Sequence, residues 1–485
     1  MLFNSYEFIF VFLPVTFCVY FFLNHKKLTT AANAFLALAS LFFYSWWNII
    51  YLPLILSSIL FNYYIGQKIH ASLDNESNKI SPKSILTFGV VVNLALLGYF
   101  KYSDFFISNS NLLLGTHFTL LHLVLPLAIS FFTFQQISYL VDSYKGKVNE
   151  HNFINYSLFV TFFPQLIAGP IVHHKEMMPQ FAMLRTKLIN YKNIATGLFI
   201  FSIGLFKKLV FADTFAKWVY FGYGGTEPMD FFGAWASATS FYHQIYFDYS
   251  GYADMAIGLG LMFNIHIPIN FLSPPKSRSV KEFWTRWNMT LSRFLRDYIF
   301  LPLGGARKGR FRTYLAVMAT FLLGGLWHGA DWTFVLWGFL HGTAVVICHT
   351  WKKYSGIKFF DWFNWFLTSF FLTVTGVLFS APNWDAAVRV FKGMVAFDKI
   401  ILPTELEFTN NFGIKFGDFL GSVNGDKWTV IWIIFGFIFV LSFKNSIERM
   451  KEFKPDLKHL VFLGFTLIIG LLYITKKSEF LYYNF

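Results

Sequence analysis

The chain has 485 residues, of which 55% are hydrophobic, 21% are aromatic and only 14% are charged. A soluble protein carries about 25% charged residues, so this composition argues against a water-soluble enzyme and indicates a membrane protein. The net charge of +14 is explained by the Lys and Arg residues that collect in the cytoplasmic loops of membrane proteins. The sequence has neither the Cys/His spacing of zinc fingers nor an arginine–aromatic strand pattern, so we expect no nucleic-acid partner.

The sequence offers no pattern for a metal or disulfide site. Its two cysteines, Cys18 and Cys348, both lie in apolar stretches and cannot form a disulfide framework or a four-cysteine zinc site. The group His173, His174 and Glu176 lacks the helical spacing of zinc proteases. We therefore expect no bound metal.

Uncharged stretches long enough to cross a bilayer predict the membrane helices. The first is 8–23, and the uncharged residues 28–67 suit two helices. The further candidates are 84–100, two helices within 105–141, 152–168, 193–206 with 209–222, 231–247, 255–271, 313–330, 332–351, 362–381, 428–443 and 459–475. We expect an all-α polytopic membrane protein with about 11–13 transmembrane or re-entrant helices, several of them short enough to be tilted.

No repeat or low-complexity tract divides the chain, so we expect a single domain over 1–485. The polar stretch 382–427 is interpreted as a connecting region. Residues 272–312 are expected to form a basic loop or re-entrant segment that faces the cytoplasm, because Lys and Arg concentrate on that side of a membrane. These positive charges could serve as topological anchors or could bind an anionic, phosphate-bearing donor.

Polar side chains within membrane helices indicate candidate catalytic residues, because burying them in the bilayer costs free energy. His328 is flanked by small residues that include Gly324 and Gly329, so a substrate or a second backbone can approach it closely. Its imidazole can accept a proton from a hydroxyl and return it. The plainer alternative is a helix–helix hydrogen bond. His341, on another face of a continuous helix, is interpreted as a supporting or packing residue.

Two acidic residues, Asp248 and Asp254, flank Gly251 within an apolar stretch. They could form a proton path. The alternative is a structural role, in which they pair with arginine or tyrosine hydroxyls in the wall of a site.

Long sequence blocks carry a family resemblance. In chain order they read FDYSGYADMAIGLG at 247–260, FWTRWN at 283–288, LSRFLRDYIFLPLGG at 291–305 and LLGGLWHGADWTFVLWGFLHG at 322–342. These blocks, in this order, resemble the membrane-bound O-acyltransferase superfamily, and in particular the bacterial branch with the membrane subunits of alginate and peptidoglycan O-acetyltransferases. The opening MLFNSYEFIFVFLPV matches that branch too, so the resemblance spans nearly the whole chain.

The resemblance places the paired active-site positions of the family on His328 and Asn288. Bacterial relatives commonly have histidine at the second position, so a two-histidine relay cannot operate in this chain. The resemblance therefore implies that His328 is the base and that Asn288 orients a carbonyl or the substrate by hydrogen bonding. The residues that we expect to bind the substrate or to support the site are His341, Trp327, Arg286, Asp248 and Asp254.

The last six residues, 480–485, resemble an aromatic C-terminal signature of this branch, in which a tyrosine is proposed to carry the acyl group. That position falls on Tyr482. An aryl ester is activated relative to an alkyl ester, so a phenol is a suitable carrier. The alternative is an aromatic anchor at the membrane interface.

The resemblance implies a helical ring around a central funnel in the bacterial inner membrane. It also implies acetyl-CoA as the acyl donor with no tightly bound cofactor, and a periplasmic serine-dependent acetyltransferase as partner alongside the membrane lipids. The acceptor would be an envelope polysaccharide such as peptidoglycan, alginate or cellulose. Two other functions remain open: a transporter or flippase for acyl groups or lipid-linked sugars that depends on Asp248 or Asp254, and a passive scaffold for a periplasmic enzyme.

Overall fold

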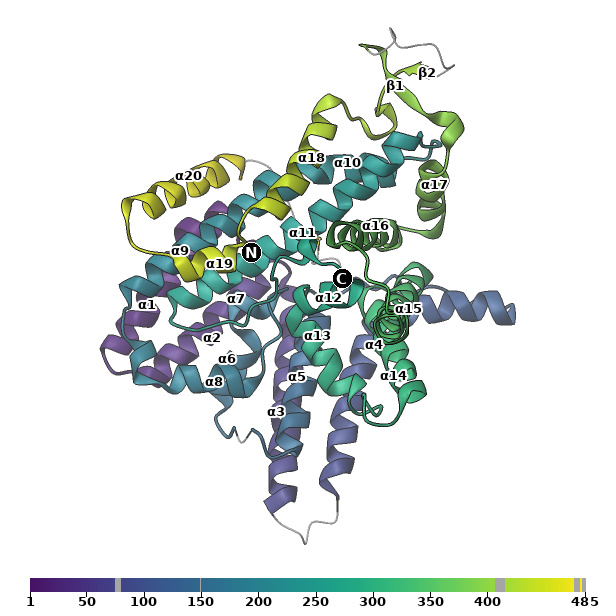
Figure 1. The fold of residues 1–485 in the computed structure, drawn as a ribbon. Helices are drawn as coiled ribbons and strands as arrows, with labels where there is room; N and C mark the ends of the chain where they lie inside the picture. The colour runs from purple at the N-terminus through teal and green to yellow at the C-terminus, as the bar shows by residue number, and fades with distance from the viewer. Residues whose placement is uncertain (75–79, 149, 406–414, 475–479, 482–485) are drawn as a thin grey trace. The chain divides into compact units, whose positions relative to one another are not determined.

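A computed structural model describes residues 1–74, 80–148, 150–405, 415–474 and 480–481. Nearly all the regular structure in this part of the chain is helical (Figure 1). The only strands in the same ranges are β1 (Ile401–Pro403) and β2 (Lys415–Gly417), which pair in parallel within the polar connecting region. The all-α prediction is therefore confirmed.

The chain forms two compact units that alternate along the sequence. The first unit comprises Met1–Leu205, Tyr252–Ile269 and Glu452–Phe485. The second comprises Phe206–Gly251 and Asn270–Lys451. Each unit has its own buried residues.

The first unit is a set of packed helices. Its helices are α1 (Leu13–His25), α2 (Thr29–Ser45), α3 (Leu52–Asp74), α4 (Pro82–Leu114), α5 (Ile129–Tyr144), α6 (Phe153–Thr161), α7 (Phe163–Leu166), α8 (His174–Ala182), α9 (Tyr191–Phe206) and α20 (Leu457–Tyr473). Aromatic residues fill part of its interior: the Phe3 ring lies 5.0 Å from that of Phe8 and 5.5 Å from that of Phe43. Phenylalanine side chains of this sequence thus pack in the core as well as lying on the surface.

The second unit carries the family blocks 283–305 and 322–342. Its helices are α10 (Asp213–Gly224), most of α11 (Phe231–Met262), α12 (Val280–Arg286), α13 (Met289–Leu295), α14 (Arg310–His328), α15 (Trp332–Tyr354), α16 (Asp361–Ser380), α17 (Trp384–Met394), α18 (Lys427–Ser442) and most of α19 (Ser446–Glu452). The basic stretch 272–312 contains α12, α13 and a π-helical turn, Arg296–Phe300, so much of it is ordered helix.

Several helices in the described residues are long and apolar enough to cross a bilayer. They are Phe8–His25, Ile49–Asp74, Pro82–Leu114, Tyr191–Gly224, Trp332–Tyr354 and Asp361–Ser380, with a seventh if Lys427–Ser442 and Ser446–Glu452, bent by 44°, form one span. The chain is therefore a multi-pass membrane protein.

Some predicted boundaries were wrong. The stretches 231–247 and 255–271 do not form two helices, because α11 runs unbroken to Met262 and no helix covers 265–271. Gly251 lies inside α11 without ending it, because a helix interior tolerates a single glycine at a modest cost. The two helices expected within 105–141 are the end of α4 and all of α5, and Gly115 ends α4 in a left-handed conformation with φ 64°.

Candidate active site

His328 is the last residue of α14 and is buried, with 3% of its surface exposed. The tight turn to α15 fixes its position. The Asp331 side chain begins α15 by accepting a hydrogen bond from the Thr333 N–H at 2.8 Å. A Cβ at Gly329 would lie 2.1 Å from the Phe334 ring, so any larger residue in this turn would force that ring to move. His328 therefore stands at the end of a closely packed helical hairpin.

The two helices of this hairpin approach each other at glycines. A Cβ at Gly325 would lie 2.3 Å from the Phe334 carbonyl oxygen, and a Cβ at Gly338 would lie 2.4 Å from the Phe321 carbonyl oxygen. Both positions therefore need glycine for the helices to pack at this distance. Gly325 and Gly338 thus allow α15 to pack closely against α14.

Aromatic rings surround the His328 imidazole. Its ring centroid lies 4.8 Å from that of Trp327, 5.4 Å from that of Trp337 and 5.0 Å from that of Phe379, each contact edge to face. Trp327 thus packs against the candidate base, and its predicted role in supporting the site stays a prediction. Such an apolar surrounding excludes water and strengthens electrostatic interactions with a reacting group.

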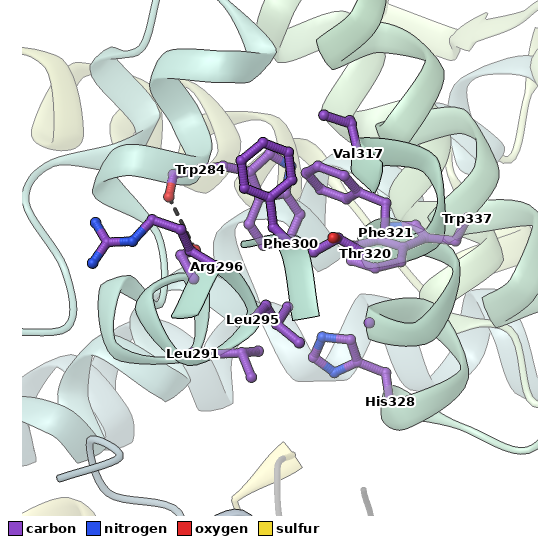
Figure 2. Close-up of a pocket in the computed structure, with 12 residues that line it drawn as sticks. Trp284, Leu291, Leu295, Arg296, Phe300, Val317, Thr320, Phe321, His328 and Trp337 are labelled. Atoms are coloured by element: carbon purple, nitrogen blue, oxygen red, sulfur yellow. Dashed lines mark hydrogen bonds between the residues drawn. The ribbon is translucent and has the colours of Figure 1, made fainter. Parts of the chain in front are cut away.

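His328 borders a cavity of about 210 Å³ within the second unit (Figure 2). The other lining residues are Trp284, Leu291, Ser292, Leu295, Arg296, Phe300, Val317, Thr320, Phe321, Gly324 and Trp337. Most of these side chains are apolar. We call this space the His328 cavity.

The side chains of three other polar residues that line the His328 cavity bind other groups of the protein. The Ser292 hydroxyl donates to the Trp284 carbonyl at 3.1 Å, and the Thr320 hydroxyl donates to the Ala316 carbonyl at 2.6 Å. The Arg296 guanidinium points away from His328 in Figure 2 and pairs with Asp297 at 2.8 Å. The imidazole is therefore the acid–base group best placed to act on a molecule in the cavity.

Asn288 lies between α12 and α13 in a left-handed conformation with φ 40° and is 1% exposed. Asparagine tolerates this conformation better than most residues do. Both polar atoms of its amide are buried without a hydrogen bond of standard geometry to the described residues, and the Tyr249 hydroxyl is the polar group that approaches them. A buried amide of this kind is available to a ligand.

Sequence reasoning missed Asn270, which holds the Asn288 turn. The Asn270 Oδ1 accepts from the Thr290 N–H at 3.0 Å and from the Thr290 hydroxyl at 2.8 Å, and its carbonyl accepts from the Met289 N–H at 3.1 Å. Asn288 does not itself line the His328 cavity, but it begins α13, the helix that contributes Leu291 to the lining. The sequence contains no local signal for the role of Asn270.

His341 is linked to the wall of the His328 cavity. The Trp284 Nε1–H donates to His341 Nδ1 at 3.2 Å, and His341 Nε2 lies 3.1 Å from the Thr375 hydroxyl. The Trp337 ring packs on His341, with centroids 4.4 Å apart, and also contacts His328. The structure therefore places His341 behind the cavity, where it supports two of the tryptophans that line it.

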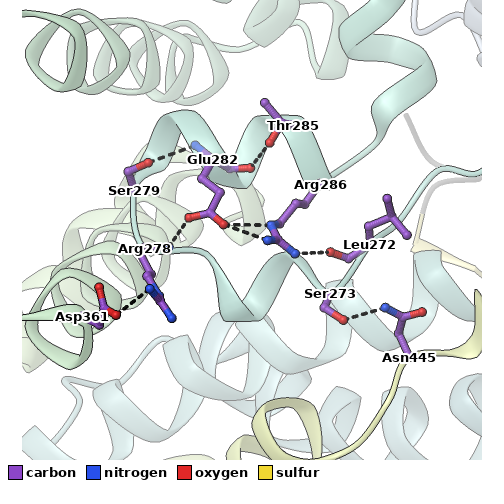
Figure 3. A network of polar contacts seen from close by, with 9 residues as sticks. All are labelled: Leu272, Ser273, Arg278, Ser279, Glu282, Thr285, Arg286, Asp361 and Asn445. Atoms are coloured by element: carbon purple, nitrogen blue, oxygen red, sulfur yellow. Dashed lines mark hydrogen bonds and ion pairs between the residues drawn. The ribbon is translucent and has the colours of Figure 1, made fainter. Parts of the chain in front are cut away.

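Arg286 secures the segment that carries α12. It pairs with Glu282 at 2.9 Å, and its NH1 group donates to the Leu272 carbonyl at 3.1 Å (Figure 3). These contacts tie α12 to the chain that precedes it. Arg286 therefore has a structural role, and its role in substrate binding stays a prediction.

Asp248 belongs to a buried ion-pair network in the second unit. Its Oδ1 accepts from Lys208 Nζ at 2.6 Å, and the same ammonium lies 3.0 Å from Asp213. The sequence-based prediction named arginine or tyrosine hydroxyls as partners, and one partner in the structure is a lysine from the π-helical turn Lys207–Ala212. Asp254 is also buried, with 3% exposure, and lies in the first unit.

Tyr482 lies outside the described residues. Phe480, at the start of the same C-terminal motif, is 1% exposed and packs edge-on against Tyr252, with centroids 4.9 Å apart. Tyr252 in turn stacks on Phe3 at 4.9 Å, within the first unit. Phe480 is thus a core residue and not an exposed aromatic anchor.

Comparison with known proteins gives the family. The family model of the membrane-bound O-acyltransferases matches residues 8–380 of the chain. The chain belongs to this family. It is therefore an acyltransferase, and His328 in its cavity lies within the part of this membrane-bound O-acyltransferase that the family model covers.

Similar proteins act on different envelope polymers. A peptidoglycan O-acetyltransferase of Helicobacter pylori is 43% identical over 100% of this chain and 98% of its own length. A probable alginate O-acetylase, AlgI, of Pseudomonas aeruginosa is 38% identical over 86% of this chain and 79% of its own. A teichoic acid D-alanyltransferase of Bacillus subtilis is 25% identical over 50% of this chain and 62% of its own.

Proposed function

We propose that this membrane-bound O-acyltransferase takes an acetyl group from a cytoplasmic thioester, acetyl-CoA, and passes it to a periplasmic serine-dependent partner that acetylates an envelope polysaccharide. The observation that carries the proposal is the imidazole of His328 at the edge of an apolar cavity of about 210 Å³. Pockets for drug-sized ligands measure about 300–1,000 Å³, so this cavity suits a small acyl group and not a long chain.

In the proposed mechanism, the His328 imidazole accepts the proton of the Tyr482 hydroxyl while the phenolic oxygen attacks the thioester carbonyl. The C–S bond then breaks, the coenzyme A thiolate takes the proton from the imidazolium, and acetyl-tyrosine remains. A serine of the periplasmic partner attacks this aryl ester and releases the tyrosine. The role that the family resemblance gives to Asn288 is a hydrogen bond to the carbonyl oxygen as negative charge develops on it. Because Asn288 does not line the His328 cavity, this role requires the thioester carbonyl to extend past the lining residues toward the start of α13.

Peptidoglycan is the proposed acceptor. The relative with that activity matches the chain from end to end, whereas the alginate relatives match a smaller share. The same reasoning places the chain in a bacterial inner membrane, with the thioester on one side and the polymer on the other. Polymer choice would then reside in the periplasmic partner.

The decisive variants are His328→Ala and Asn288→Ala. We expect loss of the base to lower the rate of acetyl transfer by about 10²- to 10⁴-fold, and loss of the carbonyl donor by about 10²- to 10³-fold. The measurement is base-labile acetate on purified peptidoglycan, with the amount of protein in the membrane measured in parallel. His459→Ala is the matched control, because it removes an imidazole that pairs with Asp456 and does not line the cavity. Normal acetylation by His328→Ala would favour the transporter alternative.

A second measurement tests the carrier step. Without the periplasmic partner, incubation with labelled acetyl-CoA should place label on the C-terminal peptide, and Tyr482→Phe should remove it. The label should also be absent in His328→Ala. Donor consumption without label on that peptide would contradict the tyrosine carrier, while leaving acyl transfer by His328 intact.

A further inference from the structure

The second unit contains a larger hollow that is separate from the His328 cavity. It measures about 930 Å³ and lies along α12, α15 and α16. We call it the lateral groove. None of the residues that the structure describes lines both spaces. A cluster of Val280, Val317 and Val345 packs with Trp284 and Phe321, and also with groove residues such as Cys348. The groove is therefore a site in its own right.

The floor of the lateral groove suits a hydrocarbon chain. Leu340, Ala344 and Ile347 line it from one face of α15, and Leu367 and Phe371 line it from α16. Both helices are candidate membrane spans. From Leu340 to Lys352, the last α15 residue that lines the groove, is about 18 Å at 1.5 Å per residue, which is close to the depth of one leaflet.

The polar side chains of the floor are already engaged. The Thr368 hydroxyl donates to the Asn364 carbonyl at 2.7 Å, and the Asn364 amide donates to the Phe359 carbonyl at 3.1 Å. An occupant with amide groups along its length, such as the pantetheine arm of coenzyme A, would lose hydrogen bonds to water here and gain few in return. An unsubstituted acyl chain has no hydrogen bonds to water to lose.

One end of the lateral groove carries positive charge. Lys281 of α12 and Lys352 of α15 both line it, and both act electrostatically on His349. Neither lysine has an ion-pair partner among the described residues.

The other charges at that end are compensated. Arg278 pairs with Asp361 at 2.6 Å, and Glu282 pairs with Arg286 at 2.9 Å (Figure 3). The Glu282 carboxylate also accepts from the Arg278 N–H at 2.8 Å. The two lysines therefore supply the surplus positive charge of the groove.

We propose that the lateral groove binds an anionic phospholipid of the cytoplasmic leaflet. Its phosphate would lie between Lys281 and Lys352, and one acyl chain would lie along α15 and α16. Basic segments concentrate on the cytoplasmic side, where anionic headgroups attract them. The apolar floor and the charged end together match one amphiphile, whereas the amide-containing arm of coenzyme A suits the charged end but not the apolar floor.

The test is lipid retention by the purified full-length protein. The protein is equilibrated in mixed micelles with phosphatidylglycerol or phosphatidylcholine, and bound lipid is counted by native mass spectrometry. We expect preferential retention of phosphatidylglycerol. The double variant K281Q/K352Q should lose this preference, since each positive charge near an anionic surface contributes about fivefold in binding.

Two controls separate the site from general charge effects and misfolding. K353Q removes the neighbouring lysine, which lies over the Tyr354 ring and does not line the groove, and it should retain phosphatidylglycerol like the unmodified protein. The charge-preserving variant K281R/K352R should also retain it. Equal retention of both lipids by the unmodified protein, or unchanged retention by K281Q/K352Q, would overturn the proposal.

Cys348, which lines the lateral groove, reports occupancy independently. In a C18S background it is the remaining cysteine of the chain. Its reaction with a maleimide should be slower in vesicles of phosphatidylcholine with phosphatidylglycerol than in phosphatidylcholine alone, and K281Q/K352Q should abolish the difference. Equal rates in both vesicles for the unmodified lysines would contradict occupancy of the groove.

Discussion

A chain of hydrogen bonds fixes the wall of the His328 cavity. Because the Trp284 Nε1–H can only donate, His341 Nδ1 must accept, and the ring proton must lie on Nε2, where it faces the Thr375 oxygen. The Thr375 hydroxyl then donates to the Phe371 carbonyl at 2.8 Å. His341 is neutral in this arrangement. Protonation of Nδ1 would release Trp284, so His341 is suited to positioning and not to proton transfer.

If the acyl group occupies the His328 cavity as proposed, we expect Trp284 in its wall to limit the length of the acyl chain. Trp284→Ala should enlarge the His328 cavity and admit longer chains, since a side-chain deletion leaves space that the surroundings fill only partly. One methylene in an apolar pocket changes specificity by about 10- to 200-fold. We therefore expect the preference for acetyl over butyryl donors, measured as the ratio of kcat/KM values, to fall by at least about tenfold.

Two further variants distinguish the effect of cavity volume from the effect of Trp284 orientation. Trp284→Phe keeps most of the ring but lacks the N–H, and Thr375→Ala leaves the cavity volume unchanged while it removes the partner of His341. Both should lower the acetyl rate more than they alter the chain-length ratio. If Trp284→Ala retains the full preference for acetyl, the cavity does not measure the acyl chain.

The residues of the candidate site were predictable only in part. His328, Asn288 and Trp327 stand in sequence blocks with a recognisable order, and local chemistry singles out the histidine. The Trp284–His341 hydrogen bond joins residues 57 positions apart, and the Asn270–Thr290 bond joins residues 20 apart. Such pairs depend on tertiary packing, so hydropathy and spacing alone could not reveal them.

Among the elements, the π-helical turn Lys207–Ala212 interrupts the helical stretch 191–224 and brings two lysines into the interior. Lys207 Nζ donates to the hydroxyls of Ser250 at 3.3 Å and Ser446 at 3.2 Å, while Lys208 pairs with Asp248. A π-helical turn inserts one residue into an α-helix and so changes the direction of its side chains. Here it lets buried cations join neighbouring elements.

Asp248→Asn tests this element. Removal of one partner leaves the Lys208 ammonium buried with less compensation, which typically costs about 3–5 kcal/mol. We therefore expect a clear loss of thermal stability in detergent. The measurement is the temperature at which the heated protein no longer elutes as a monodisperse peak in size-exclusion chromatography. The double variant Lys208→Met with Asp248→Leu should recover much of the stability.

The matched control for this loss is Asp361→Asn, which breaks the exposed pair with Arg278 and should cost no more than about 1 kcal/mol. A stable Asp248→Asn protein that nevertheless loses acetylation would instead assign Asp248 to proton movement. That outcome would revive the path that the sequence leaves open for Asp248 and Asp254.

Helices were more predictable than their ends. The length and hydropathy of uncharged stretches located most of the long helices, because a bilayer sets a minimum apolar length. They did not reveal that α11 continues through Gly251 and Asp254, since neither residue breaks a helix whose polar groups find partners inside the fold. The apolar stretch 193–222 also concealed the π-helical turn, because its two lysines read as a boundary between helices.

For the molecule as a whole, polar chemistry is distributed over both units. The second unit holds the His328 cavity and the Lys208–Asp248 pair. The first unit holds a histidine–carboxylate contact: His174 Nε2 lies 3.3 Å from Glu150 Oε2. His174 begins α8, and Glu150 precedes α6, so this contact joins two short helices that bury apolar residues. Stability of the first unit should therefore depend on the charge of Glu150.

The pH dependence of this contribution has a definite sign. Burial raises the pKa of Glu150, but the His174 imidazole and the Asn152 N–H, which donates to Glu150 at 2.8 Å, outweigh burial and lower the pKa below its usual 4.5. A carboxylate with a lowered pKa in the folded state stabilises that state above its unfolded pKa, and the contribution is lost as pH falls through the folded value. Glu150→Gln should therefore lower the melting temperature at neutral pH by about 2–4 °C for each kcal/mol lost. The difference from the unmodified protein should shrink progressively below pH 4.5. Melting curves that stay parallel across this range would show that the charge of Glu150 does not stabilise the first unit.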